Sequence, residues 1–389
     1  MIDEVAKQLH KGKLKPSDLN KELITETYKE LNSGASSGYG KKWTKFPANG
    51  KGNLPLELKK NIYAFSSAKT YAQLEAINSL LYDSEGKLRP FNEFLQLAKK
   101  TGHQFNKNYL QAEYQTARTA AQMAQKWEKI QETKDLFPNL KFRTVGDNRV
   151  RDEHARLDGV IKPIDDPFWS RYYPPLDWRC RCDVVQTAEA VTSHEEKNMP
   201  KVNFRGNVAL DKEIFTAKGT FFKLAAGDEN AVRNIEIAKL YAPYETAYKN
   251  EKGKSLQVNI FADPKDLSEN VRIGEILVDE LRTNVLIRPH LDGRIAKGMK
   301  NPEYLIDNRL AERKSPTSRD YAKSLSKANK QECEIVVFDL SLNGDTPEAA
   351  MSKIQSLLSY ANVHPFIKEI YVISKDGNEV KHYIRKKAD

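Results

Sequence analysis

The chain has 389 residues, of which 39% are hydrophobic and 30% are charged, and it carries 63 lysines and arginines against 53 aspartates and glutamates. This composition is apolar enough for folded cores, which excludes a wholly disordered chain, and the length predicts two or three domains. No apolar run approaches the ~20 residues of a membrane helix, and the N-terminus lacks the apolar segment of a secretory signal. Three cysteines cannot form a disulfide framework. Membrane proteins, secreted disulfide scaffolds and collagen-like chains are therefore excluded, and we expect a soluble protein made in a reducing cytosol.

The positive charge is concentrated in the first part of the chain. Residues 255–389 hold 21 lysines and arginines against 20 aspartates and glutamates, so nearly all of the excess lies in residues 1–254. Such a basic region is consistent with contact to a polyanion such as nucleic acid. It is equally consistent with a solvated, lysine-rich surface.

Residues 1–135 read as a helical region. The strongest segment runs from Tyr109 to about Glu132, contains no glycine or proline, and repeats apolar residues at three- and four-residue steps. The loop-forming composition of Asn32–Gly38 indicates a flexible connection. Further helical segments are expected at Ser17–Leu31, Leu54–Ala64, Thr70–Leu81 and Phe91–Lys99.

Residues 136–225 change character, because prolines, aromatic residues and arginines crowd together there. This composition predicts an irregular, loop-rich module. Residues 226–254 read as a linker that contains one helix, Glu229–Ala242, and ends in the polar run Asn250–Lys254.

Residues 255–389 alternate between strand and helix patterns, which predicts a compact α/β domain with a mixed sheet. Glu334–Leu340 is the expected central strand, because nearly every position in it is apolar. Two short polar turns, Asp307-Asn308 and Asp376-Gly377, indicate hairpins. The expected strands are Leu256–Phe261, Val285–Ile287, Glu303–Ile306, Arg309–Lys314, Glu334–Leu340, Glu369–Ser374 and Glu379–Arg385. The expected helices are Leu267–Leu281, Arg319–Lys330 and Pro347–Ala361.

The most specific sequence motif lies in the irregular module. Residues 144–159 read TVGDNRVRDEHARLDG, and they are followed by DDPFW at 165–169 and PPLDWRCRC at 174–182. This order of motifs resembles the phage Mu F-like head-morphogenesis family, the minor head proteins of tailed phages and prophages, over roughly residues 15–225. The resemblance implies a structural component that acts with the portal and other prohead proteins, first in the bacterial cytoplasm and then in the virion. Packaged DNA is an implied neighbour, and no membrane is involved.

The same module contains three residues of the types that bind zinc. His154, Cys180 and Cys182 supply one imidazole and two thiols, and Asp147 or Asp158 offers a fourth ligand. A structural zinc would order a module that has little regular secondary structure. The alternative is that both cysteines are small buried packing residues and that His154 is a hydrogen-bonded core histidine.

A second candidate site lies in the C-terminal domain. Residues two apart on a strand face the same side, so Glu312 and Lys314 project together, and Glu303 joins them from the preceding hairpin strand. The two carboxylates can hold a divalent cation, Mg²⁺ or Zn²⁺, and the lysine can stabilise a phosphate transition state. We expect a lysine on such a surface to contribute little to stability. The alternative is an ordinary exposed pattern of charges across two strands.

This arrangement resembles the PD-(D/E)xK nucleases, with Glu303 in place of the usual aspartate and Asp307 as a nearby substitute. The surrounding sequence resembles the C-terminal tRNase domain of contact-dependent growth inhibition toxins, over about residues 256–387. The resemblance implies catalytic roles for Glu275 and Gln331 as well as for Glu303, Glu312 and Lys314. It also implies tRNA or another RNA as substrate and an immunity protein as partner. Glu275 could instead be a solvated helix residue, and Gln331 a helix end.

The sequence therefore predicts a multidomain phage or prophage minor head protein that ends in a metal-dependent, phosphodiester-cleaving endonuclease acting on tRNA. The expected parts are a helical region at 1–135, a Mu F-like module at 136–225, a linker at 226–254 and a PD-(D/E)xK-like domain at 255–389. Two alternatives stay open. One is a purely structural capsid protein with an inactive nuclease fold, and the other is a DNA nuclease that acts during packaging.

Overall fold

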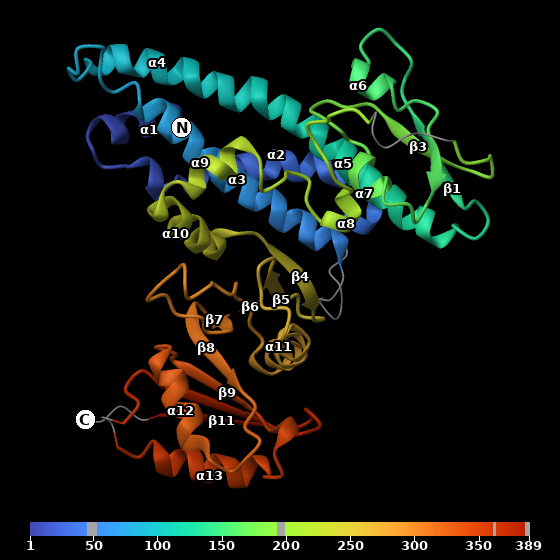
Figure 1. Cartoon of the computed structure of the whole chain (residues 1–389). Helices are drawn as coiled ribbons and strands as arrows, with labels where there is room; N and C mark the ends of the chain where they lie inside the picture. The colour runs from blue at the N-terminus through green and yellow to red at the C-terminus, as the bar shows by residue number, and fades with distance from the viewer. Residues whose placement is uncertain (45–52, 193–198, 361–362, 386–389) are drawn as a thin grey trace. The chain divides into compact units, whose positions relative to one another are not determined.

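The chain is described by a computed structural model that covers residues 1–44, 53–192, 199–360 and 363–385 (Figure 1). It divides into two compact units, the first reaching to Ile235 and the second beginning at Glu236. Within these residues no helix is both long enough and apolar enough to cross a bilayer.

The first unit is mainly helical, as the sequence predicted (Figure 1). The helices α4 and α5 are joined through a π-helical turn, and the residues at both junctions keep right-handed helical angles, so the three elements form one helical run. The helical elements are α1 (Ile2–His10), η1 (Pro16–Asp18), α2 (Lys21–Tyr39), η2 (Lys41–Thr44), α3 (Leu54–Asn78), α4 (Phe91–His103), η3 (Gln104–Tyr109), α5 (Leu110–Glu132), α6 (Asp152–Ala155), α7 (Trp169–Tyr172), α8 (Val208–Asp211), α9 (Thr220–Ala226) and α10 (Glu229–Ala238), which continues into the second unit.

The run Asn32–Gly38 is not a loop but the last two turns of α2. Its glycines serve close packing against α5. A Cβ atom on Gly34 would lie 2.9 Å from the Tyr114 carbonyl oxygen, and one on Gly38 would lie 2.0 Å from that of Arg118. Glycine is therefore required because the two helix backbones approach each other closely, and not because the chain turns.

The segments expected at Leu54–Ala64 and Thr70–Leu81 form the single helix α3. Ser66 and Ser67 lie between the two segments and are fully buried. Their hydroxyls donate to the carbonyl oxygens of Ile62 and Tyr63, one turn earlier, at 2.8 and 3.0 Å. This bonding satisfies the serine hydroxyls inside the helix, so the polar stretch does not interrupt it.

Residues 136–225 contain a small antiparallel sheet in the strand order β2-β1-β3, surrounded by loops and short helices. The strands are β1 (Asn139–Arg143), β2 (Ile161–Pro163) and β3 (Asp183–Thr187). A hydrophobic cluster ties this sheet to the end of α5, and Phe142, Trp169 and Tyr173 are among its most buried members. Tyr173 also donates its hydroxyl to the Met123 carbonyl oxygen of α5 at 3.0 Å.

The second unit is a mixed sheet of eight strands in the order β11-β10-β9-β8-β7-β6-β5-β4. The pairs β8/β9, β9/β10 and β5/β6 are parallel, and the other pairs are antiparallel. The strands are β4 (Tyr244–Lys249), β5 (Ser255–Asn259), β6 (Val285–Ile287), β7 (Tyr304–Ile306), β8 (Arg309–Lys314), β9 (Ile335–Asp339), β10 (Glu369–Ile373) and β11 (Val380–Ile384). The helical elements are η5 (Lys239–Tyr241), α11 (Leu267–Leu281), α12 (Tyr321–Lys330), η6 (Leu340–Leu342) and α13 (Pro347–Leu357).

These elements agree with the expected α/β domain, with bounds that are the same or differ by one or two residues, whereas three segments in this domain and in the expected linker before it differ in other ways. The run Asn250–Lys254, read as the end of a linker, forms the turn between β4 and β5, so the sheet begins before residue 255. Of the last expected helix, α13 ends at Leu357 and Ala361 lies outside the described residues. The helix expected at Glu229–Ala242 ends at Ala238 and continues as the 3₁₀ turn η5.

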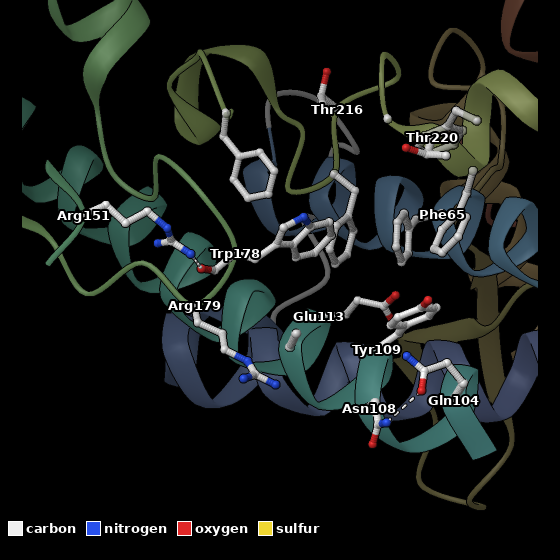
Figure 2. Close-up of a pocket in the computed structure, with 16 residues that line it drawn as sticks. Phe65, Gln104, Asn108, Tyr109, Glu113, Arg151, Trp178, Arg179, Thr216 and Thr220 are labelled. Carbon is white, nitrogen blue, oxygen red and sulfur yellow. Dashed lines mark hydrogen bonds between the residues drawn. The ribbon is translucent and has the colours of Figure 1, made fainter. Parts of the chain in front are cut away.

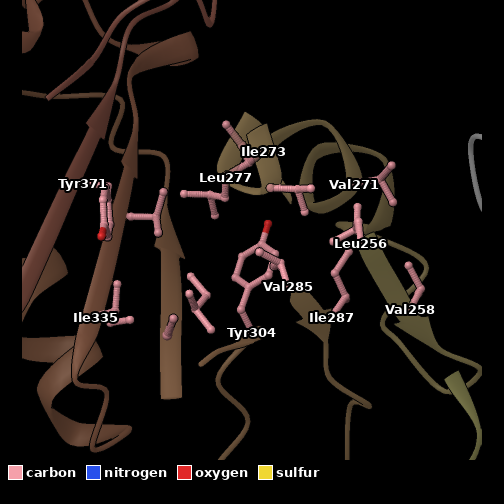
Figure 3. Packing of buried hydrophobic residues seen from close by; sticks show 14 of the residues in the cluster. Leu256, Val258, Val271, Ile273, Leu277, Val285, Ile287, Tyr304, Ile335 and Tyr371 are labelled. Atoms are coloured by element: carbon pink, nitrogen blue, oxygen red, sulfur yellow. The ribbon is translucent and has the colours of Figure 1, made fainter. Parts of the chain in front are cut away.

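Each face of the sheet is covered by helices. On one face, residues of α11 such as Leu277 pack on Leu256, Tyr304 and Ile335 (Figure 3). On the other face, α12 and α13 pack on Val336 and Phe338 of β9 and on Val372 of β10. The strand β9 is buried at every position, as expected for a central strand covered on both sides.

The hairpin turn Asp307-Asn308 joins β7 to β8. Both residues have positive φ, 49° and 61°, which is the backbone conformation of a two-residue hairpin turn whose twist matches the flanking strands. This turn fixes the register in which Tyr304 pairs with Ala311.

Candidate functional site

Glu303, Glu312 and Lys314 come together on the face of the sheet that α12 and α13 cover. Tyr304 pairs with Ala311, so Glu303 and Glu312 are the next neighbours across the two strands. Glu312 pairs with Val336, whose side chain belongs to the cluster beneath α12 and α13, which identifies the face. We call Glu303 and Glu312 the carboxylate pair.

The carboxylate pair is largely withdrawn from water. Glu312 is 4% exposed, and its Oε2 atom has no hydrogen-bond partner among the described residues. Burial, followed by the adjacent Glu312 carboxyl group, raises the pKa of Glu303 to about 9, while Lys314 opposes the shift. Lys314 supplies one positive charge for two buried carboxyl groups, so the raised pKa leaves a proton on Glu303 at neutral pH.

Lys314 donates a hydrogen bond to Glu312 Oε1 in a partly buried ion pair, with side chains that are 18% and 5% exposed. This contact differs from the surface lysine that the sequence indicated, and it leads us to expect that Lys314 contributes to stability. Its loss would leave the Glu312 carboxylate buried without a counter-ion, and such groups are costly.

Two neighbours of the carboxylate pair were missed in the sequence. Arg288 follows β6 and donates from its guanidinium to the Pro302 carbonyl oxygen at 2.9 Å, while its backbone N–H donates to the Glu303 carbonyl oxygen at 2.8 Å. Burial lowers the pKa of this guanidinium, and Tyr244, Cys333 and then Glu312 oppose the shift. Cys333 is fully buried, and burial followed by the neighbouring Glu312 and Glu303 carboxyl groups raises the pKa of its thiol. Neither residue belongs to a recognisable motif, and only the pairing of β6 with β7 places Arg288 beside Glu303.

Gln331 lies at the same end of the sheet as the carboxylate pair. Its Oε1 atom accepts a hydrogen bond from the backbone N–H of Asn301, two residues before Glu303, at 2.9 Å. The neighbouring Lys330 carbonyl oxygen accepts from Lys300 at 2.8 Å. Gln331 therefore holds the segment that leads into Glu303.

Glu275 and Asp307, by contrast, do not join the carboxylate pair. Glu275 is on α11, which covers the opposite face of the sheet, and its pKa is raised by burial and then by Asp279. Asp307 is at the hairpin tip, at the other end of β7 from Glu303, and accepts a hydrogen bond from Thr283. The position across from Glu312 is thus occupied by Glu303.

Beneath the carboxylate pair, on the α11 face, polar groups hold β8 in place. Arg313 donates to Asn270 Oδ1 at 2.7 Å and lies within 3.4 Å of Asp339 Oδ2. Its backbone N–H also donates to Glu303 Oε2 at 3.1 Å. Ser315, which the sequence places just after the lysine, donates to Asp339 at 3.2 Å. These contacts fix the strand that carries Glu312 and Lys314.

In the first unit, His154, Cys180 and Cys182 also come together, and all three are buried. His154 Nδ1 lies 3.7 Å from Cys180 Sγ and 3.6 Å from Cys182 Sγ. A hydrogen bond between the two cysteines is the main cause that lowers the pKa of the Cys180 thiol and raises that of the Cys182 thiol. We call these three residues the His–Cys cluster.

The two aspartates considered as a fourth ligand are engaged elsewhere. Asp147 accepts two hydrogen bonds of 2.7 Å from the Arg181 guanidinium. Asp158 accepts from the backbone N–H of Thr144 at 2.6 Å and from its hydroxyl at 3.1 Å. Neither belongs to the set of mutually close ligand atoms that the described residues form.

The first unit also has a cavity of about 640 Å³ that the sequence did not indicate (Figure 2). Phe65 and Trp178 are among its aromatic lining residues, and Arg151 and Arg179 reach it from one side. Glu113 also lines the cavity, and this carboxylate forms a buried ion pair with Lys69 of α3.

Comparison with known proteins confirms both resemblances predicted from the sequence. Residues 85–185 match the family described as "Phage Mu protein F like protein". Residues 300–378 match the family described as "Contact-dependent growth inhibition CdiA C-terminal domain", and this segment contains Glu303, Glu312 and Lys314. The chain thus combines a Mu F-like region with a CdiA C-terminal-like region.

Two curated relatives match parts of the chain. The chain is 43% identical over 61 residues to "Putative capsid assembly protein F" of Escherichia phage Mu. The matched segment covers 16% of this chain and 14% of that protein. It is 42% identical over 74 residues to "Mu-like prophage FluMu F protein" of Haemophilus influenzae. This matched segment covers 19% of this chain and 17% of that protein. The chain therefore spans about a sixth or less of the length of these relatives.

One solved structure also shows similarity, the "CdiA-CT/CdiI toxin and immunity complex from Burkholderia pseudomallei". The match is 19% identical, covers 31% of this chain and 86% of that chain, and has a TM-score of 0.25. A TM-score of this size does not establish a common fold.

Proposed function

We propose that this chain is a phage or prophage head protein whose second unit is a metal-dependent nuclease of the PD-(D/E)xK type. The observation that carries the nuclease proposal is the carboxylate pair with Lys314 on one face of the sheet. Glu312 has a buried oxygen that no described residue hydrogen-bonds, and Glu303 holds a proton that a cation would displace. A divalent cation satisfies such a pair better than a proton does, because two carboxylates are its preferred ligands.

Glu303 and Glu312 would hold the cation, and Lys314 would act on the substrate. A bound Mg²⁺ or Zn²⁺ supplies Lewis-acid polarisation of a phosphate oxygen and lowers the pKa of bound water. Lys314 sits two residues from Glu312 on the same strand, so its ammonium group can stabilise negative charge that develops on the phosphate. Arg288 and Gln331 hydrogen-bond to Pro302 and Asn301, and they hold in place the segment before β7 that carries Glu303. Glu275 lies on the other face, and we assign it no part in the reaction.

RNA is the proposed substrate, with tRNA as the first to test. This choice rests on the sequence resemblance of residues 256–387 to the tRNase domain of contact-dependent growth inhibition toxins, a region that overlaps the family match at residues 300–378. The charge of residues 255–389 is nearly neutral, which slightly disfavours broad nonspecific binding of duplex DNA, because that binding depends on positive charge. By the same sequence resemblance, an immunity protein is the proposed partner of the second unit.

The full chain should be incubated with tRNA, other RNA and duplex DNA, each with Mg²⁺, with Zn²⁺ and with EDTA. We expect metal-dependent cleavage of RNA that Glu312→Gln abolishes. Glu275→Gln and Asp307→Asn are matched acidic controls that should keep activity. Cleavage of DNA alone would favour the packaging nuclease, and a folded chain inactive on all three substrates would favour a purely structural protein.

The proposed role of the first unit is in the assembling head. The match of residues 85–185 to the Mu F-like family supports this role, and so does the excess of basic residues before position 255, which suits a place near packaged DNA. The proposed partners are the portal and other prohead proteins, and the proposed locations are the bacterial cytoplasm during assembly and the virion afterwards. A chain ending at Ile235, the last residue of the first unit, should still be incorporated into proheads. Failure of this folded fragment to enter heads would contradict the assignment.

A further inference from the structure

We propose that the His–Cys cluster is a zinc site, in which His154 Nδ1 and the thiolates of Cys180 and Cys182 are the three protein ligands. The site belongs to the first unit and is independent of the carboxylate pair in the second. It rests on the geometry of the three ligand atoms and on what surrounds them.

The two nitrogen–sulfur distances are those that a tetrahedral zinc requires. With Zn–S bonds of about 2.3 Å and a Zn–N bond of about 2.0–2.1 Å, tetrahedral angles place nitrogen and sulfur about 3.6 Å apart. The two observed nitrogen–sulfur distances are 3.7 and 3.6 Å. All three ligand atoms lie within 4.8 Å of one another, which groups them as one candidate ligand set.

The surroundings explain why a metal would be useful at this place. His154 is on α6, a helix of four residues, and the two cysteines are on the loop that leads into β3. The strands β1 and β2 are also short, so hydrogen bonding within regular structure contributes little to the order of the module. An ion held by His154, Cys180 and Cys182 would join α6 to β3 across 26 residues of chain and leave both cysteines within the hydrophobic cluster.

A small cavity adjoins the three ligand residues and offers room for a fourth ligand. A space of about 20 Å³ is lined by all three ligand residues and by arginines that include Arg149 and Arg179. This volume is enough for one water molecule, which needs about 10–15 Å³. Because Asp147 and Asp158 are both bonded elsewhere, we assign the fourth position to this water.

The test uses the full chain, purified without chelator and dialysed. We expect about one zinc per chain from this site by elemental analysis, and loss of that equivalent in Cys180→Ser and in His154→Gln. Cys333→Ala and His103→Gln are matched controls, because Cys333 is a buried cysteine of the second unit and His103 is an exposed histidine at the end of α4. Both controls should keep the zinc. Asp158→Asn should also keep it if water is the fourth ligand.

Cobalt substitution separates this site from the carboxylate pair. Co²⁺ bound by two thiolates gives a sulfur-to-metal charge-transfer band in the near ultraviolet and visible bands typical of tetrahedral cobalt. We expect these bands in the wild type and in Glu303→Gln, and their loss in Cys180→Ser. Absence of the bands and of zinc from wild-type protein with reduced cysteines would overturn the proposal. So would zinc that persists when both cysteines are serine in the Glu303→Gln background.

Discussion

Glu303 lies next to Glu312 across the ladder between β7 and β8, and the two carboxyl groups share one buried face of the sheet. The ordinary pKa of a glutamate in the unfolded chain is about 4.3, whereas burial and the Glu312 carboxyl group raise that of Glu303 to about 9. The folded state therefore keeps a proton that the unfolded state releases between these two values. The stabilisation linked to this proton is complete below the unfolded pKa and is lost as the pH rises through about 9.

The first prediction concerns this pH dependence. In EDTA, the wild-type melting temperature should fall between pH 5 and pH 9 more steeply than that of Glu303→Gln, because the amide has no proton to lose. Thermal unfolding followed by circular dichroism across this range measures the difference. Glu251→Gln, at an exposed position in the β4–β5 turn, should behave as the wild type. Parallel pH profiles for wild type and Glu303→Gln would refute the raised pKa.

The second prediction concerns metal affinity at the same pair. Because a cation must displace the Glu303 proton, the affinity for Mg²⁺ or Mn²⁺ should rise with pH by about tenfold per unit until about pH 9. Calorimetric titration in two buffers of different ionisation enthalpy should report release of about one proton per metal bound. These titrations should be made in the Cys180→Ser background, so that the His–Cys cluster does not contribute. Metal binding without proton release would contradict the prediction.

The third prediction separates catalysis from stability at Lys314. Lys314→Ala should lower cleavage by a factor of about 100 or more, the usual effect of removing one preorganised group beside developing charge. It should also lower the melting temperature, because Glu312 then loses its partner. The double variant Lys314→Met/Glu312→Gln should recover the melting temperature but not the activity. Lys375→Ala, at an exposed position in the β10–β11 loop, is the matched control and should change neither.

The fourth prediction concerns the buried ion pair between Lys69 of α3 and Glu113 of α5, whose side chains are 1% and 3% exposed. Burial lowers the pKa of Lys69 and raises that of Glu113, so each group depends on the other for its charge. Glu113→Ala should reduce the stability of the first unit by about 3–5 kcal/mol. Lys69→Met/Glu113→Leu should recover most of that loss in urea unfolding. Equal losses in the single and double variants would show that packing, and not the uncompensated charge, decides the effect.

The fifth prediction concerns where the second unit begins. A fragment starting at Ser255 lacks β4, which pairs with β5 and covers its edge, so it should be less stable and less soluble than one starting at Glu236. Expression of the longer fragment in a bacterium should arrest growth, and its Glu312→Gln variant should not. Comparison of the two growth curves at equal soluble expression provides the measurement. Harmless accumulation of the folded 236–389 fragment would favour the structural alternative.

Several elements could be read from the sequence because their signals are local. The turn Asp307-Asn308 and the continuous apolar run of β9 gave the hairpin and the central strand, and α11 was expected with the bounds it has. The residues of the His–Cys cluster were recognised in the sequence as candidate zinc ligands, because imidazole and thiol groups are typical ligands of zinc. Local sequence signals gave a wrong prediction where the role of a residue depends on contact with a segment far away along the chain. Gly34 and Gly38 indicate a loop by composition, but they lie where α2 touches α5.

Only the tertiary structure decided which candidate residues share a surface. Glu275 and Glu303 are both acidic and both fit the expected pattern, yet α11 covers one face of the sheet and the carboxylate pair lies on the other. Arg288 has no motif, and it lies beside Glu303 because β6 pairs with β7. The sequence by itself determined the residue types, the turns and the families to which two regions are similar, since these depend on neighbours along the chain. Burial, the raised pKa of Glu303 and the pairing of Lys314 with Glu312 depend on strand order, which only long-range packing sets.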